Sequence, residues 1–234
     1  MKILSVVHGP DVRAELFQPV VARGGHALDE WSFSWGRRPP RPLESYDAYM
    51  VFGGAMHPDQ DAQHTWLPEE VAWLEQLLAD RRPVLGVCLG VELLARAAGA
   101  QVRRLDEAEI GWIDIDLNDA GAEDPVLGSL PRRFPGLVWH HYTYDVPDGA
   151  VELARTDRTT QAFRLGDSCW GVQFHPEVTG VQLEHWIADF EDPPPDPDGL
   201  RAETPHKIGA WNELGRTLCS AFLETSNKLL LATR

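Results

Sequence analysis

Short apolar runs alternate with helical patterns along the first hundred residues of the chain. Runs rich in apolar residues are typical of buried strands, and they cover residues 2–7, 26–33, 48–52 and 83–87. Apolar residues at helical spacing fall between these runs, over residues 11–22, 68–78 and 90–98. Strands that alternate with helices indicate a parallel sheet that is covered by helices on both faces.

The pattern changes after residue 100. Shorter strands joined by turns are predicted at residues 102–105, 112–117, 151–154 and 161–164, before a core strand at 169–174 and a helix at 181–190. We therefore expect an α/β fold with an open, mostly parallel sheet of the flavodoxin-like kind, helices on both faces and an antiparallel β extension. This domain is expected to span residues 1–190.

The last part of the chain differs in composition. Residues 191–200 are rich in proline and aspartate, which predicts a loop. Residues 201–234 carry apolar side chains at helical spacing. We expect them to form a helical extension that packs on the same domain.

The net charge limits the partners of the chain. With 21 basic and 36 acidic residues the formal net charge is −15, and such a field repels nucleic acids and anionic membranes. No apolar run has the length of a membrane-spanning helix, and the N-terminus lacks the long apolar region of a signal peptide. The three cysteines, Cys88, Cys169 and Cys219, are too few for a disulfide framework. These features predict a cytoplasmic protein that binds neither nucleic acid nor membranes.

Cys88 lies where a buried strand turns into a helix, within the sequence GVCLG. Such a turn presents its side chain at the carboxyl edge of the sheet, near free backbone N–H groups and the positive end of a helix dipole. Both favour a thiolate, and Gly86 and Gly90 permit the close backbone approach of a nucleophile elbow. The alternative is that Cys88 is a small buried apolar residue.

A nucleophilic cysteine requires a base, and His175 stands at the end of the core strand at 169–174. Glu177 follows two residues later, on the same side of an extended backbone, where it can hold the second ring nitrogen. Taken alone, His175 could be a structural histidine and Glu177 a solvated loop charge. Together with the G-x-C-x-G pattern they predict a Cys-His-Glu triad.

The segments GVCLG at 86–90 and VQFHPE at 172–177 resemble the two motifs of the class I glutamine amidotransferases. The resemblance extends to VFGGAMHPDQD at 51–61, EIGW at 109–112 and the segment 139–147. These are similar to stand-alone members that look like the amidotransferase part of GMP synthetase. The resemblance covers roughly residues 1–190, and the residues from 191 on are not part of it.

The resemblance implies hydrolysis of the glutamine side-chain amide. Cys88 would attack the amide and form a thioester, His175 would act first as base and then as acid, and Glu177 would orient His175. The products would be glutamate and ammonia. No cofactor and no metal are implied.

The resemblance also implies groups that bind the substrate. Backbone N–H groups of Gly54 and Leu89, next to Gly53, would stabilise the oxyanion. The segment with His140, His141 and Tyr142 lies where the family has a Trp-His-Gly-Asp-like sequence that contacts the amino-acid end of the substrate. His141 and Tyr142 replace the Gly and Asp of that pattern, so their contact with substrate stays open.

Glu92 is a second departure from the family, which usually has glutamine at this position. Glutamate keeps an acceptor but removes the amide donors and adds a charge. Some γ-glutamyl hydrolases and peptidases, which are relatives with the same triad, carry glutamate there. The alternative is that Glu92 is an exposed residue that suits the N-terminal helix dipole.

Three functions remain open at this point. The first is a glutamine-hydrolysing amidotransferase that supplies ammonia to a separate synthetase, because no G-x-x-x-x-G-K-[ST] nucleotide loop occurs in the chain. The second is a free-standing γ-glutamyl hydrolase or peptidase with the same triad. The third is a non-catalytic binding module of the same fold. The nitrogen acceptor, the identity of a synthetase and the oligomeric state are not encoded in any motif.

Overall fold

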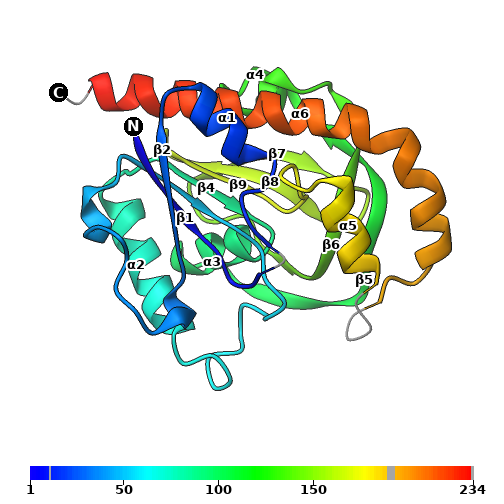
Figure 1. Cartoon of the computed structure of the whole chain (residues 1–234), viewed down its shortest axis with the longest axis horizontal. Coiled ribbons are helices and arrows are strands. Elements are labelled where there is room, and N and C mark those ends of the chain that lie inside the picture. Colours follow the sequence, from blue (N-terminus) through cyan, green and yellow to red (C-terminus); the bar gives the residue numbers. More distant parts are fainter. Residues whose placement is uncertain (11, 189–192, 233–234) are drawn as a thin grey trace.

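The computed structural model describes residues 1–10, 12–188 and 193–232. Within them the chain forms one nine-stranded sheet with helices on both faces (Figure 1). The strands are β1 (Lys2–Val6), β2 (Ala27–Trp31), β3 (Ala48–Val51), β4 (Val84–Val87), β5 (Val102–Leu117), β6 (Arg133–Tyr144), β7 (Ala150–Arg155), β8 (Thr160–Leu165) and β9 (Cys169–Val172). The helices are α1 (Phe17–Arg23), α2 (Leu67–Ala79), α3 (Leu89–Ala97), α4 (Asp119–Glu123), α5 (Gly180–Ile187) and α6 (Pro197–Ala232).

One half of the sheet is parallel. Its strands lie in the order β2-β1-β3-β4-β9, and all four neighbouring pairs run in the same direction. This arrangement confirms the predicted α/β fold with a flavodoxin-like sheet. Because the strands are parallel, the chain ends of β3, β4 and β9 meet at one edge of the sheet.

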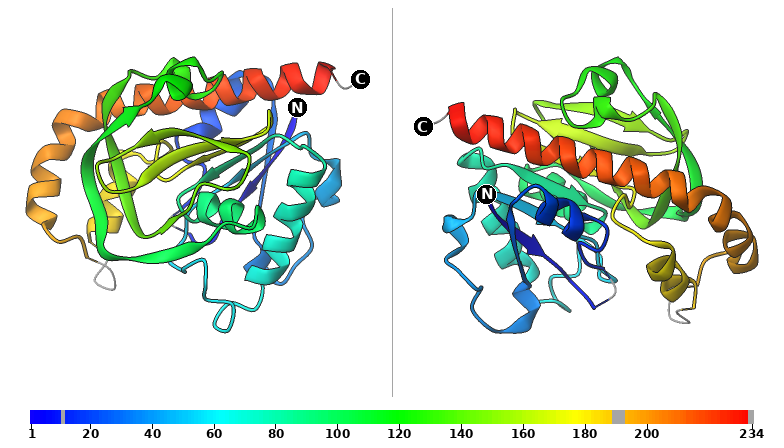
Figure 2. Two further views of the ribbon diagram at one scale, coloured as in Figure 1. Left: turned by 180° about the vertical axis from the view of Figure 1, so that it is seen from behind. Right: turned by 45° about the horizontal axis from the view of Figure 1, so that its top comes forward.

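The other half is antiparallel and continues as β8-β7-β5-β6. This half curls around the parallel part, as the views in Figure 2 show. The prediction of two short strands at 102–105 and 112–117 was wrong, because they belong to the single strand β5, interrupted by an irregularity between Arg104 and Glu109. Strand β6 was not predicted, and it carries the segment that contains His140 to Tyr142.

Alternation of side chains along the strands divides the core into two layers. Ile3 and Met50 face the layer that also holds the buried side of α6, whereas Leu4 and Val51 face the layer under α2 and α3. Strands β1, β3, β4 and β9 are therefore covered on both faces, which explains why they read as continuous apolar runs.

The first helix is shorter than the predicted range 11–22, and residue 11 lies outside the described residues. Val12 forms an isolated bridge with Gly9, which keeps this part of the chain out of a helix until Phe17. The predicted helix at 181–190 begins at Gly180 and ends at Ile187, and residues 189–190 are not described.

Helix α6 begins inside the stretch 191–200 that was predicted as a loop, of which residues 191–192 are not described. The carboxylate of Asp196 accepts a hydrogen bond from the N–H of Gly199 at 2.9 Å, and Pro197 supplies the first helical φ. The ribbon bends in its N-terminal part, where Pro205 lacks a donor, and then crosses the molecule beside α1 (Figures 1 and 2).

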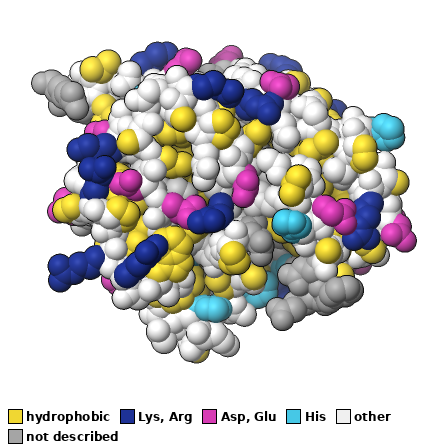
Figure 3. All heavy atoms as spheres, in the orientation of Figure 1, with side chains coloured by type: hydrophobic (Ala, Val, Ile, Leu, Met, Phe, Trp, Pro, Cys, Tyr) yellow, Lys and Arg dark blue, Asp and Glu magenta, His cyan; other side chains and the backbone are white. Residues whose placement is uncertain are grey.

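Charged side chains of both signs are interspersed over the face of the molecule seen in Figure 3. On this face the negative net charge of −15 is therefore not gathered into a single patch. None of the helices in the described part of the chain combines the length and apolar character that crossing a membrane requires.

Candidate active site

Cys88 stands at a sharp turn between β4 and α3. Its φ of 53° and ψ of −113° lie in a region that L-residues rarely adopt. The two flanking glycines make the turn possible: a Cβ on Gly86 would lie 2.7 Å from the carbonyl oxygen of Gly90, and a Cβ on Gly90 would overlap the carbonyl oxygen of Val51. The G-x-C-x-G pattern therefore reflects steric demands at this turn.

His175 follows β9, and its backbone N–H donates to the carbonyl of Leu137 at 2.8 Å. The Nδ1 atom of its ring is 2.8 Å from Oε1 of Glu177, and both side chains are buried. The ring also packs edge-on against Trp186, with 4.8 Å between the centroids. These contacts fix the imidazole and leave Nε2 as the nitrogen that can face another group.

The thiol of Cys88 is the group that His175 approaches, because each side chain influences the pKa of the other. A Cβ on Gly53 would lie 3.2 Å from Cε1 of His175 and 3.4 Å from Cβ of Cys88, so the two side chains flank the same point. The structure therefore brings Cys88, His175 and Glu177 together, although they come from separate parts of the chain.

The electrostatics of the pair favour a proton on the imidazole. Burial opposes the charge on His175, but the Glu177 carboxylate and the Cys88 sulfur outweigh it and raise the pKa of the ring to about 10. Burial raises the pKa of the Cys88 thiol above its ordinary value, and the neighbouring His175 offsets only part of this rise. An imidazolium beside a sulfur stabilises the thiolate form of that sulfur.

Gly54 and Leu89, the residues expected to supply backbone N–H groups to the oxyanion, line the same cavity as Cys88. Leu89 is the first residue of α3, and the first N–H groups of a helix have no acceptor within that helix. Gly54 is its neighbour, since a Cβ on Gly54 would lie 3.2 Å from Cδ2 of Leu89 and 2.7 Å from Cβ of His8.

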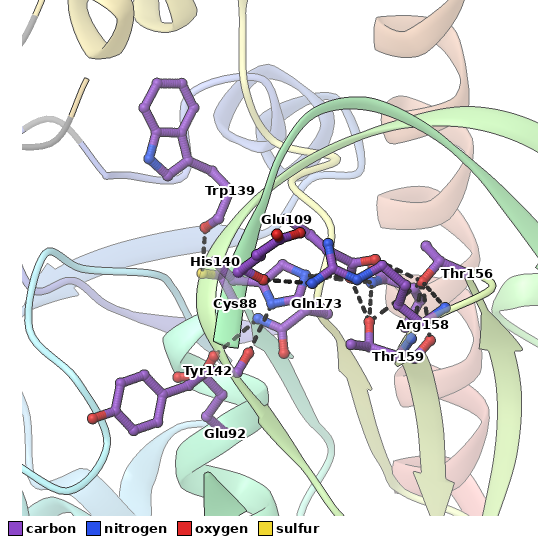
Figure 4. Close-up of polar contacts among 12 residues, drawn as sticks. Cys88, Glu92, Glu109, Trp139, His140, Tyr142, Thr156, Arg158, Thr159 and Gln173 are labelled. Atoms are coloured by element: carbon purple, nitrogen blue, oxygen red, sulfur yellow. Dashed lines mark hydrogen bonds and ion pairs between the residues drawn. The ribbon is translucent and has the colours of Figure 1, made fainter. Parts of the chain in front are cut away.

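Glu92 is buried one helical turn after Cys88, with 4% of its surface exposed, so the interpretation of Glu92 as an exposed residue was wrong. Its Oε1 accepts a hydrogen bond from Nε2 of Gln173 at 3.0 Å (Figure 4). Burial raises the pKa of Glu92 to about 8, against the lowering effects of Gln173 and His175. A large fraction of Glu92 is therefore protonated at neutral pH.

The segment from Trp139 to Tyr142 passes over the thiol. The sulfur of Cys88 donates to the carbonyl of Trp139 at 3.5 Å (Figure 4). The hydroxyl of Tyr142 donates to Asp59 at 3.0 Å, and its ring stacks on His57 with 4.7 Å between centroids. His141 also lines the cavity, so the two residues that replace Gly and Asp of the family pattern form part of its wall.

The ring of His140 is held by a buried network at the back of the site. Its Nδ1–H donates to the carbonyl of Tyr142 at 2.7 Å, and Nε2 is 3.1 Å from the Glu109 carboxylate. Glu109 in turn accepts hydrogen bonds from Thr156 at 2.9 Å and from Thr159 at 2.5 Å (Figure 4). The roles of Thr156 and Thr159 could not be found in the sequence, because no local spacing links them to residue 109.

His8 and Glu70 form a second buried pair that the sequence did not suggest as a site. Nε2 of His8 is 3.1 Å from both carboxylate oxygens of Glu70, and Nδ1 is 3.0 Å from the carbonyl oxygens of Phe52 and Gly53. His8 also lines the cavity. In the sequence His8 belongs to a turn signal, and no motif joins it to a residue 62 positions away.

The cavity above these groups has a volume of about 320 Å³. Its walls include His8, Gly54, His57, Cys88, Leu89, Glu92, Trp139, His140, His141, Tyr142, His175 and Trp186. Within the described residues no three His, Cys, Asp or Glu side chains are grouped as a metal would require.

An α/β sheet with a cysteine elbow and a histidine-glutamate pair at its carboxyl edge defines an amidotransferase-type fold. A sequence profile of the family "Glutamine amidotransferase class-I" matches residues 28–191. The chain belongs to this family, whose chemistry is hydrolysis of the glutamine amide and transfer of ammonia.

Relatives with known names agree with this assignment. A glutamine amidotransferase-like protein of Salmonella typhimurium, YfeJ, is 28% identical over 91% of each chain. A glutamine-hydrolysing GMP synthase subunit of Sulfurisphaera tokodaii is 33% identical over 60% of this chain and 72% of its own. The crystal structure of a glutamine amidotransferase from Thermotoga maritima superposes with a TM-score of 0.86 at 26% identity, covering 96% of this chain and 98% of that one. Full-length GMP synthases also match, and the chain spans about a fifth of their length.

Proposed function

We propose that this protein hydrolyses the side-chain amide of glutamine at Cys88 and releases ammonia for a separate acceptor enzyme. The observation that carries the proposal is the meeting of the Cys88 thiol and the Glu177-bound His175 imidazole beside Gly53, in a cavity of about 320 Å³. A cavity of this volume lies in the range of cavities that bind small ligands, a group to which free glutamine belongs.

The proposed reaction has two stages. The Cys88 thiolate attacks the amide carbon, and the N–H groups of Gly54 and Leu89 stabilise the oxyanion of the tetrahedral intermediate. His175 then donates a proton to the nitrogen, the carbon–nitrogen bond breaks, and ammonia leaves a γ-glutamyl thioester. In the second stage His175 removes a proton from water, which attacks the thioester and releases glutamate and the thiol. Glu177 orients His175 throughout.

The ammonia acceptor is proposed to be a synthetase on another chain. Support comes from the names of the relatives, since the matching protein of Sulfurisphaera tokodaii is named as one subunit of a GMP synthase. Within this chain no Gly-rich nucleotide loop of the P-loop type occurs.

Glu92 supports a second candidate, a hydrolase of other γ-glutamyl amides or peptides. Its carboxyl lines the cavity at a position where a glutamine side chain would supply amide donors. Substrate contacts at this wall therefore differ from those of relatives that have glutamine at this position.

The decisive experiment measures ammonia release from glutamine by the purified chain, in parallel with cleavage of γ-glutamyl dipeptides. Ammonia release that is lost in Cys88→Ala supports the proposal, whereas rapid dipeptide cleavage with glutamine inert supports the second candidate. A glutamine analogue that carries an electrophile should label Cys88 much faster than Cys169 or Cys219. Equal labelling rates of the three cysteines would show that the Cys88 thiol is not activated. That result would favour the third function, a non-catalytic binding module of the same fold.

A further inference from the structure

His8 connects a buried carboxylate to the strand end that carries Gly53 and Gly54. Its side chain and that of Glu70 are both fully buried. The ring also stacks on Trp66, with 5.5 Å between centroids and an interplanar angle of 17°. A histidine held on three sides in this way has a fixed ring plane.

The contacts define where the protons of His8 lie. Nδ1 faces two carbonyl oxygens at 3.0 Å, those of Phe52 and Gly53, and carbonyl oxygens only accept, so Nδ1 carries a proton. Nε2 is equidistant, at 3.1 Å, from both oxygens of Glu70, which is the geometry of an N–H directed between two carboxylate oxygens. These contacts have the geometry that an imidazolium facing a carboxylate makes.

The charge on the ring is supported by its surroundings. Burial opposes it, but the Glu70 carboxylate and the carbonyls of Gly53 and Phe52 outweigh burial and raise the pKa of His8 above its ordinary value. Stacking of the cation on the indole of Trp66 is favourable as well.

The acceptor carbonyl of Gly53 belongs to the same peptide unit as the N–H of Gly54. In a trans peptide the C=O and N–H point in opposite directions, and the described residues contain no cis peptide bond. Fixing the carbonyl against His8 therefore fixes the direction of the Gly54 N–H. A positive charge on the carbonyl side also polarises the peptide and strengthens its N–H as a donor.

We propose that His8 and Glu70 are a positioning pair that orients and polarises the Gly53–Gly54 peptide for stabilisation of the oxyanion. This inference rests on the proposed function, because the oxyanion arises only during attack on an amide. Neither residue exchanges a proton with the substrate. Their effect is exerted on the transition state through the Gly54 N–H.

Glu70→Gln is the variant of choice, since glutamine keeps the size and can still bond Nε2 of a neutral His8. Nδ1–H remains on the Gly53 carbonyl, but the charge behind it is lost. We expect kcat with glutamine to fall about 10- to 100-fold with KM changed less than about twofold, because loss of a whole oxyanion donor costs about 100- to 1,000-fold. Glu69→Gln, exposed and adjacent in α2, should leave both constants unchanged.

Alkylation of Cys88 by iodoacetamide provides the readout that separates positioning from a general structural role. Alkylation displaces iodide and forms no oxyanion, so the rate of alkylation in Glu70→Gln should equal that of the wild type. A parallel fall of alkylation and hydrolysis would show that the pair merely supports the fold, and an unchanged kcat would show that the charge is irrelevant. Either result overturns the proposal.

Nitrogen NMR of the His8 ring gives a test that needs no turnover. We expect both ring nitrogens to be protonated at neutral pH in the wild type and only Nδ1 in Glu70→Gln, with the signals assigned by their absence in His8→Asn. An unprotonated Nε2 in the wild type would refute the imidazolium. Absence of ammonia release by the wild type would refute the proposed function instead, so the two failures are distinguishable.

Discussion

Substitution of Glu92 by glutamine should make the protein more stable, by an amount that grows with pH. Burial raises the pKa of Glu92 from 4.5 to about 8, so between these values the folded protein keeps a proton that the unfolded chain releases. The free energy of unfolding of the wild type therefore falls as pH rises through this window. A solution at pH 7 lies about two and a half pH units above the unfolded pKa of 4.5. Each unit lowers the free energy of unfolding by about 1.4 kcal/mol, so the wild type loses about 3 kcal/mol.

Glutamine at position 92 has no such titration, and its carbonyl can still accept from Gln173, which donates to Glu92 at 3.0 Å. Urea unfolding of the wild type and Glu92→Gln should show a gap that widens by about 2.5 kcal/mol between about pH 5 and about pH 7. Because both proteins share every other titrating group, those contributions cancel in the gap. Glu69→Gln, which is exposed, serves as the control. A gap that stays constant over this range would refute a protonated Glu92.

Three further outcomes follow from the elbow and the triad. Cys88→Ala and His175→Ala should abolish ammonia release. Glu177→Ala should slow ammonia release less, because removal of an orienting carboxylate costs less activity than removal of a nucleophile. Equal losses of activity in steady-state assays would contradict this order. Cys88→Gly should be more stable to urea than Cys88→Ala by about 1 kcal/mol, because only glycine adopts φ of 53° without strain, and the reverse order would argue against the strained turn. Gly90→Ala should lower the free energy of unfolding by more than about 2 kcal/mol, since its Cβ would overlap the carbonyl oxygen of Val51; thermal unfolding at the wild-type temperature would disprove the overlap.

The parallel half of the fold was predictable because its signals are local. Strands β1, β3, β4 and β9 are buried on both faces and so appear as apolar runs, and Gly86 and Gly90 mark the elbow within five residues. The contact of His175 with Glu177 was predictable for the same reason, since only two residues separate them, although Pro176 and Glu177 lie in a turn and not in the extended chain that was expected.

The antiparallel half was harder to predict. Strand β6 contains Pro135 and Gly136, which interrupt the apolar pattern that would have predicted a strand. The pair of His8 and Glu70 was missed because its geometry depends on β1 and α2 meeting across the sheet edge. Contacts of this kind follow no periodic pattern in the sequence, so they were identified only from the structure.

Helix α6 has a consequence for where this protein can be divided. The indole of Trp211 donates to the carbonyl of His175 at 2.9 Å, Asn212 donates to the carbonyl of Val178 at 2.8 Å, and a Cβ on Gly215 would overlap the carbonyl of Pro176. The match to the family ends at residue 191, yet the loop bearing His175 is braced by residues beyond that limit. A fragment trimmed to the family boundary would lose this brace, so the structural unit that holds His175 extends past residue 191.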